Sequence, residues 1–372
     1  MGLRQPRVED LVTAAEMRIL VTGNMGYVGP CVVEHLRETR PGAELVGLDT
    51  GFFAHCLTGS TLLPERRLDC QYFDDVRSVP PRALEGITGV VHLAGVSNDP
   101  IGTSFETATL DVNHRATVAL ARAAKEAGAR SFVFASSCSV YGLAEDGLRT
   151  EQSETGPLTA YATSKLLAER DLAELADATF VVTSLRFATA CGMTERLRLD
   201  LVLNDFVAGA HAFRAITLLS DGTPWRPLIH VRDMARAIDW ALDRPTDRGG
   251  AFLALNTGSD EWNYQIRQLA DAVASIVPGV EVSVQEDAPP DARSYKVSFA
   301  RFRELAPDHQ PQVGLQAAIE DLSAGLERMG FSDPDFRNSR LVRLRVMNDL
   351  RDEGLVTDEL RWAPAAEIPV RG

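Results

Sequence analysis

The chain alternates short apolar runs with stretches in which an apolar residue recurs every three or four positions. Continuous apolar runs are typical of buried parallel strands, and the longer spacing is typical of amphipathic helices. The clearest runs are 18–23, 44–49, 68–76, 90–95, 130–137 and 179–187, and the clearest helical stretches are 31–38, 104–128 and 161–175. We therefore predict an α/β fold of Rossmann type, a doubly wound parallel sheet with right-handed crossovers.

The 372 residues are enough for one large α/β domain and a smaller one. We expect residues 17–189 to form the sheet domain, with 222–258 returning to it, and residues 190–372 to form mainly a smaller C-terminal substrate-binding domain and a C-terminal extension. Residues 1–16 have no apolar core of a secretory signal, so we interpret them as an extension ahead of Met17. An amphipathic helix is predicted near 341–350; it either caps the smaller domain or forms an oligomer contact.

Composition narrows the class of protein. An apolar content of 45% and a charged content of 24% are ordinary for a soluble globular protein. The net charge of −14 argues against nucleic acid or an anionic membrane as the main partner. No apolar run approaches the ~20 residues that span a bilayer. The five cysteines are scattered without a CxxC pair, which favours reduced thiols in a cytoplasmic protein and gives no support for a metal site.

Three glycines follow the first apolar run, at Gly23, Gly26 and Gly29. Strand, glycine turn and helix form the context of a dinucleotide fingerprint, in which the backbone approaches a pyrophosphate at the helix N-terminus, although a purely structural turn can have the same glycines. Asp49 ends the next run, twenty residues after Gly29. A carboxylate there suits two ribose hydroxyls and repels a 2′-phosphate, which favours NAD over NADP.

A serine, a tyrosine and a lysine follow in the second half of this region. Ser137 ends the run 130–137, and Tyr161 and Lys165 lie in YATSK, where they could also be ordinary i,i+4 neighbours on a helix surface. Together with TGNMGYVG, DDV, HLAG, SSCSVYG and RPLIHVRD in this order, they make the chain resemble the extended short-chain dehydrogenase/reductase family, in its nucleotide-sugar epimerase and dehydratase branch. The resemblance covers roughly residues 17 to 330.

The resemblance implies roles for these residues. Tyr161 would be the acid/base and Ser137 would orient the reacting oxygen, while Lys165 would bind the nicotinamide ribose and lower a tyrosine pKa that is about 10 in a free side chain. Asn113 would keep the active-site helix in register. The implied NAD contacts are Gly23, Gly26, Tyr27, Val28, Gly29, Asp49, Asp75, Val76, Leu93, Ala94, Gly95, Asn113, Tyr161 and Lys165.

The implied partner is a nucleoside-diphosphate sugar. Its expected contacts are Ser97, Asn98, Ser137, Cys138, Ser139, Thr189, Asn204, Arg226 and Arg293. The two arginines suit bidentate binding of a diphosphate, although a surface ion pair explains Arg293 equally well. Cys138 is either an acid/base for epimerisation at C3 or C5 or a packed thiol.

Departures from the family pattern bear on the reaction. The 4,6-dehydratases of the branch carry an Asp-Glu pair where this chain has Cys138 and Ser139, which disfavours dehydration, and Thr189 replaces a family asparagine. We expect an NAD-dependent nucleotide-sugar epimerase, most simply acting at C4 through a transient 4-keto intermediate. The alternatives are a 4-ketoreductase or dehydrogenase on the same substrates, and a non-catalytic dinucleotide-binding sensor. By resemblance, a homodimer is expected.

Overall fold

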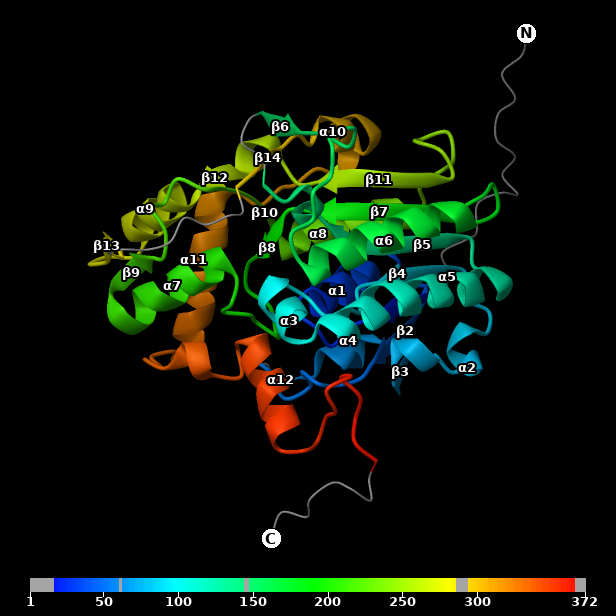
Figure 1. Ribbon diagram of the computed structural model, residues 1–372, viewed down its shortest axis with the longest axis horizontal. Coiled ribbons are helices and arrows are strands. Elements are labelled where there is room, and N and C mark those ends of the chain that lie inside the picture. The colour runs from blue at the N-terminus through cyan, green and yellow to red at the C-terminus, as the bar shows by residue number, and fades with distance from the viewer. Residues whose placement is uncertain (1–16, 60–61, 144–146, 286–293, 365–372) are drawn as a thin grey trace.

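The computed structural model describes residues 17–59, 62–143, 147–285 and 294–364. At their centre is a sheet of seven strands in the order β11-β7-β5-β4-β1-β2-β3 (Figure 1). Each neighbouring pair in this sheet is parallel, so the predicted doubly wound parallel sheet is confirmed. Its strands are β1 (Arg18–Thr22), β2 (Glu44–Asp49), β3 (Cys70–Phe73), β4 (Gly89–His92), β5 (Ser131–Ser137), β7 (Val181–Phe187) and β11 (Phe252–Thr257).

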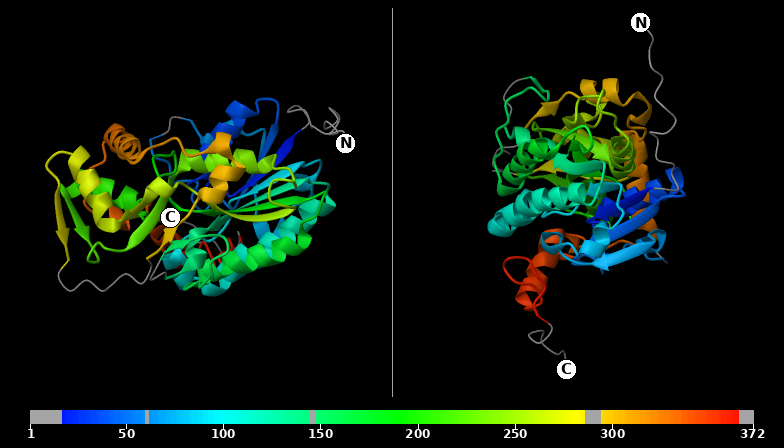
Figure 2. Two further views of the ribbon diagram at one scale, coloured as in Figure 1. Left: turned by 90° about the horizontal axis from the view of Figure 1, so that it is seen from above. Right: turned by 90° about the vertical axis from the view of Figure 1, so that its right-hand side faces the viewer.

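Helices cover both faces of the sheet (Figure 2). Ile19 and Val21 of β1 pack into the core on one face, and Leu20 between them packs into the core on the other face. Burial on both faces explains why the strands are continuous apolar runs rather than alternating ones. The first face is covered by α1 (Gly29–Thr39) and α8 (Val231–Leu242), and the second by α2 (Pro81–Leu84), α5 (Thr117–Glu126) and α6 (Ala160–Leu175).

The helical stretch predicted for 104–128 is divided in the structure. It consists of α4 (Glu106–Leu110), the π-helix η5 (Asp111–Ala116) and α5. The π-helix carries Asn113, whose buried side chain accepts a hydrogen bond from the backbone N–H of Val96 and donates to its carbonyl. A widened turn therefore lets one polar side chain tie this helix to the loop after β4, in keeping with the frequent occurrence of π-helical turns at functional sites.

A smaller lobe lies beside the sheet domain, at the left of Figure 1. It is built around α7, β9, β13, α9 and α11, with β8, β10 and β12 forming a three-stranded sheet next to it. The remaining strands are β6 (Leu148–Arg149), β8 (Thr189–Cys191), β9 (Ala215–Leu218), β10 (Trp225–His230), β12 (Asn263–Gln265), β13 (Glu281–Val284) and β14 (Lys296–Val297). The remaining helices are α3 (Asp99–Ser104), α7 (Val202–Phe213), α9 (Ile266–Ile276), α10 (Ala300–Leu305), α11 (Leu315–Arg328) and α12 (Arg343–Asp352).

The C-terminal segment returns to the sheet domain after α11. Met347 of α12 and the later Leu360 share a buried apolar cluster with Val96 of the loop after β4, Ile101 of α3 and Phe105, the residue between α3 and α4. The predicted C-terminal helix is therefore present, and it packs beside the sheet domain. Among the described residues, no helix combines the length and the apolar character that crossing a bilayer requires.

Candidate functional site

A large cavity runs along the carboxyl ends of the parallel strands. Its volume is about 1070 Å³, and it is lined by residues that follow β1, β2, β4 and β5 together with residues of the smaller lobe. Strand ends of an open parallel sheet are where such folds bind ligands. The volume slightly exceeds the upper end of the ~300–1,000 Å³ that small-molecule sites commonly occupy, which suits two ligands bound end to end.

The glycine turn after β1 forms a close backbone cradle at one wall of this cavity. Gly23 has φ +72°, and a Cβ placed on it would lie 2.5 Å from the backbone nitrogen of Ala94. A Cβ on Gly29 would lie 2.2 Å from the carbonyl oxygen of Asn24. No side chain caps the start of α1, so its first N–H groups are available to an anion. This cradle fits the pyrophosphate of a dinucleotide.

Asp49 lies at the end of β2 and faces the same cavity. Its carboxylate accepts hydrogen bonds from the backbone N–H groups of Met25 at 3.0 Å and Gly51 at 2.8 Å. Burial raises its pKa above the usual value, against the effect of these two hydrogen bonds. The side chain is thus oriented by the glycine turn, in the position expected for a ribose contact.

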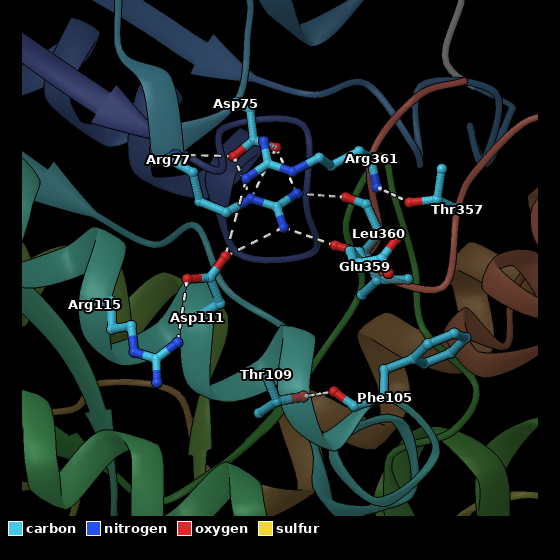
Figure 3. A network of polar contacts seen from close by, with 10 residues as sticks. All are labelled: Asp75, Arg77, Phe105, Thr109, Asp111, Arg115, Thr357, Glu359, Leu360 and Arg361. Carbon is cyan, nitrogen blue, oxygen red and sulfur yellow. Dashed lines mark hydrogen bonds and ion pairs between the residues drawn. The ribbon is translucent and has the colours of Figure 1, made fainter. Parts of the chain in front are cut away.

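Asp75 and Val76 also line the cavity, after β3. The Asp75 carboxylate is bound by Arg77, whose Nη2 lies 2.6 Å from Oδ2 (Figure 3). Burial opposes ionisation of Asp75, but the hydrogen bonds and charge of Arg77 outweigh it and lower the pKa of Asp75. The carboxylate expected to contact the adenine therefore has a protein partner of its own.

Ser137, Tyr161 and Lys165 converge on the other half of the cavity. Ser137 is the last residue of β5, and Tyr161 and Lys165 lie on the first two turns of α6. The Ser137 hydroxyl is near enough to the Tyr161 phenol to lower the pKa of that phenol. The Lys165 ammonium donates to the carbonyl of Ala135 at 2.8 Å and lies 5.7 Å from the centre of the Tyr161 ring. The three side chains form one contiguous polar group.

The pKa values of this group differ from the sequence-based expectation. Burial raises the pKa of Tyr161 to about 12, against the effects of the Ser137 hydrogen bond and the Arg198 charge. Burial lowers the pKa of Lys165 to about 8. Lys165 therefore does not hold the tyrosine pKa down in the protein alone, because desolvation of the phenolate outweighs a charge that is directed at a backbone carbonyl. A further positive charge in the cavity is needed to favour the phenolate.

Arg198 and Asp200, which the sequence did not single out, join the predicted Ser97 and Asn98 in a polar cluster near Tyr161. Arg198 binds Asp200 through two hydrogen bonds, Nε to Oδ1 at 3.0 Å and Nη2 to Oδ2 at 2.8 Å, and donates to the Ser97 hydroxyl at 2.9 Å. Asn98 donates to Asp200 at 2.9 Å. The backbone of Asn98 has φ 84°, an unusual value for a residue with a side chain and one that is often found at functional sites. In the sequence, the alternation of arginine with leucine in RLRLD, residues 196–200, could have pointed to Arg198 and Asp200.

Most of the predicted site residues line the cavity. Those that do are Gly23, Gly26, Tyr27, Val28, Gly29, Asp49, Asp75, Val76, Leu93, Ala94, Gly95, Ser97, Asn98, Ser137, Ser139, Tyr161, Lys165, Thr189 and Arg226. Arg226 is buried and donates to the carbonyl of Trp225 at 2.9 Å. Arg293 lies outside the described residues.

Three predicted site residues do not line the cavity. Cys138 is 1% exposed and donates to the carbonyl of Arg186, and burial raises the pKa of its thiol. These observations favour a packed thiol over an acid/base. Asn204 is 0% exposed, accepts from the Gly192 N–H and donates to the hydroxyl of Tyr27, which makes it a support of that residue. Asn113 is also buried. Its side chain accepts a hydrogen bond from the Val96 N–H and so holds the loop after β4 in place.

A Rossmann sheet whose strand-end cavity combines a glycine cradle with a serine, a tyrosine and a lysine defines an extended short-chain dehydrogenase/reductase. More narrowly, the chain belongs to the NAD dependent epimerase/dehydratase family, whose model matches residues 19–254. NAD is accordingly the cofactor, and the glycine cradle and Asp49 described above fit it.

Three relatives illustrate this membership. The chain is 30% identical over 277 residues to a UDP-glucose 4-epimerase of Streptomyces lividans, covering 70% of this chain and 80% of that protein. It is 24% identical to UDP-glucuronic acid decarboxylase 6 of Arabidopsis thaliana, covering 82% of this chain and 87% of the relative. Among solved structures, MoeE5 in complex with UDP-glucose and NAD is 28% identical with a TM-score of 0.68, covering 84% of this chain and 99% of MoeE5. Fold and family are thereby established, and the family members differ in their reactions.

Proposed function

We propose that the protein is a nucleoside-diphosphate-sugar epimerase that inverts C4 through a transient 4-keto sugar. The observation that carries the proposal is the Ser137, Tyr161 and Lys165 group on a cavity large enough for a dinucleotide and a second ligand. The relatives named UDP-glucose 4-epimerase and the MoeE5 complex with UDP-glucose support the substrate class. The burial of Cys138 and the neutral side chain of Ser139 give no support to a dehydratase reaction at these positions.

Each residue of the group has a defined task in this proposal. Ser137 holds the C4 hydroxyl of the sugar, and Tyr161 accepts the proton of that hydroxyl and returns it at the end of the cycle. Lys165 is proposed to contact the nicotinamide ribose of the cofactor. Its ammonium also places a positive charge near the Tyr161 phenol. Bound NAD would supply a hydride acceptor and donor for C4 of the sugar, and its positive charge would favour the Tyr161 phenolate.

The remaining cavity residues hold the substrate. The Arg198–Asp200 pair with Asn98 offers fixed donors and acceptors opposite Tyr161, suited to sugar hydroxyls. Arg226, a buried residue of β10 that lines the cavity, suits the diphosphate. We propose that two copies of the chain form a homodimer, as family resemblance suggests; size-exclusion chromatography with light scattering checks this, and a monomer mass would contradict it.

A turnover experiment in D₂O tests the C4 proposal. The purified protein is incubated without added NAD with UDP-glucose, UDP-N-acetylglucosamine and the corresponding GDP, CDP and dTDP sugars, and products are identified by proton NMR. We expect a C4 epimer whose ring carbons carry no solvent deuterium, because the hydride returns from within the site. Deuterium at C3 or C5 would contradict C4 epimerisation and indicate chemistry next to the keto group.

Two controls complete this experiment. Tyr161→Phe is expected to abolish turnover because phenylalanine cannot accept a proton from the substrate, while the other implied contacts keep NAD bound. Turnover that requires added cofactor in proportion to product would contradict epimerisation and favour a 4-ketoreductase or dehydrogenase. A thermal-shift panel of nucleoside diphosphates identifies the base, because a ligand that binds the folded state raises its stability.

A further inference from the structure

We call the C-terminal segment 343–363 the strap. It consists of α12 and the chain that follows it. It lies beyond residues 19–254, the part matched by the family model. MoeE5 is covered over 99% of its length, whereas only 84% of this chain is covered, so this chain has segments without a counterpart in that relative. The strap has no role in the function proposed above.

The strap supplies one wall of the cavity. Arg343, Met347 and Leu360 line it, beside Phe52 and Phe53 of the loop after β2. Leu360 is 4% exposed and has φ 54°, a left-handed backbone that leucine rarely adopts. Such a backbone persists where the surrounding contacts hold it in place. The wall at Leu360 is therefore a fixed feature, and it belongs to the same end of the cavity as Asp75 and Val76.

Arg77 fastens the strap to the loop that carries Asp75 (Figure 3). Its Nη1 donates to the carbonyl of Glu359 at 2.7 Å, and its Nη2 donates to the carbonyl of Leu360 at 2.6 Å. The Arg77 side chain is 5% exposed; its bond to Leu360 is partly buried, and its bond to Glu359 lies at the surface. Arg77 thus joins the strap and Asp75 through one guanidinium group.

Further contacts tie the strap to the loop after β2 and to η5. The indole Nε1 of Trp362 donates to the carbonyl of Thr50 at 2.7 Å, and its ring lies 4.9 Å from that of Phe52. Arg361 lies 3.8 Å from Asp75 and 4.0 Å from Asp111, which also pairs with Arg77 at 3.5 Å. The strap is therefore attached to the segments that follow Asp49 and Asp75, the two acids at the adenosine end of the cavity.

We propose that the strap is a part of the NAD site, which closes over the adenosine half so that NAD leaves only after the strap has detached. The proposal goes beyond the C4 reaction and requires only that the cofactor is NAD. Retention suits an enzyme that regenerates its cofactor within each turnover, since release would interrupt the cycle. Contacts that must break before release act on the dissociation rate more than on the association rate.

Two truncated chains and one substitution test this. A chain ending at Gly354 loses Leu360 and Trp362, and a chain ending at Pro364 keeps them and serves as the matched control. Trp362→Ala weakens the attachment without touching the cavity wall, and Arg345→Ala removes an exposed side chain of α12 that pairs only with Asp349. Each protein is loaded with NAD, separated from excess, and mixed with ethanol and alcohol dehydrogenase, so that released NAD is read as NADH absorbance.

We expect NAD release at least about tenfold faster from the chain ending at Gly354, and severalfold faster from Trp362→Ala. The chain ending at Pro364 and Arg345→Ala should release NAD at the rate of the full chain. Circular dichroism reports folding of each protein, and Trp362→Ala carries the test if the shorter chain does not fold. Unchanged release from folded Trp362→Ala, or equal acceleration in the Pro364 chain, would overturn the proposal. No sugar is present, so this result is independent of the C4 reaction.

Discussion

Replacement of Glu169 by Gln should weaken both the fold and the activity at high pH. Glu169 lies on α6 one turn after Lys165 and is 4% exposed. Its carboxylate accepts three hydrogen bonds from Arg186, at 3.0, 3.1 and 2.6 Å, and one from the Ser136 hydroxyl at 2.6 Å. Glutamine keeps the length of the side chain but has one acceptor oxygen, and its amide group faces the guanidinium of Arg186.

The stability loss follows from a buried cation left without its counter-ion. Removal of one partner of a buried ion pair costs about 3–5 kcal/mol. For a chain of this size, about 2 °C of Tm per kcal/mol then gives a decrease of about 6–10 °C. Arg186 is almost fully buried, so water cannot replace the lost carboxylate without a rearrangement of the core.

The activity effect arises through Lys165. Burial lowers the pKa of Lys165 to about 8, and the Glu169 charge opposes this decrease. Without the carboxylate the lysine pKa falls further, so the ammonium loses its proton at a lower pH. Because the Lys165 charge adds to that of bound NAD in favouring the Tyr161 phenolate, the basic limb of the pH profile should move to lower pH.

The assay is the profile of kcat/KM from about pH 6 to pH 10, together with Tm by calorimetry. Glu174→Gln is the matched control, because Glu174 is an exposed acid on the same helix. An unchanged Tm and an unchanged basic limb in Glu169→Gln would refute the reasoning. A lower Tm with an unchanged limb would leave Glu169 a purely structural partner of Arg186.

Three further substitutions address other parts of the cavity. Gly23→Ala should weaken NAD binding by at least about a hundredfold, because its Cβ would lie 2.5 Å from the Ala94 nitrogen. Calorimetric titration measures this, and an affinity within about threefold of the original would contradict the role of the glycine turn in binding NAD. Arg198→Lys should raise KM for the sugar with little change in NAD affinity, because lysine cannot make the paired contact with Asp200. An unchanged KM would show that Arg198 does not contact the sugar. Cys138→Ala should keep kcat within about twofold and cost about 1 kcal/mol of stability, and loss of turnover in a folded protein would restore the acid/base interpretation.

The fold and the cofactor were predictable because their signals are local. Apolar runs identify strands buried on both faces; Gly23 directly follows β1, and Asp49 is the last residue of β2. The carboxyl ends of parallel strands meet at one edge, so residues far apart in the chain reach one cavity without further information. Ser137 is placed by the same rule, and Tyr161 and Lys165 are placed by the period of one helix.

The burial of individual polar side chains was not predictable in this way. Nothing in the sequence around Cys138, Asn204 or Arg198 separates a residue of a cavity wall from one of a packed interior. Their roles depend on partners, such as the Arg186 carbonyl for Cys138 and Asp200 for Arg198. Likewise, the tyrosine pKa depends on how far the phenol is removed from water.

The C-terminal helix shows where local information ends. Apolar periodicity near 341–350 indicates that a helix has one face to bury, and it holds no information about the surface that covers that face. The surface follows from contacts between distant parts of the chain, among them the bond from Arg77 to the carbonyl of Leu360, 283 positions later. Such a contact forms only when the whole chain has folded, since backbone carbonyls are alike in every sequence and become specific only through their position in space.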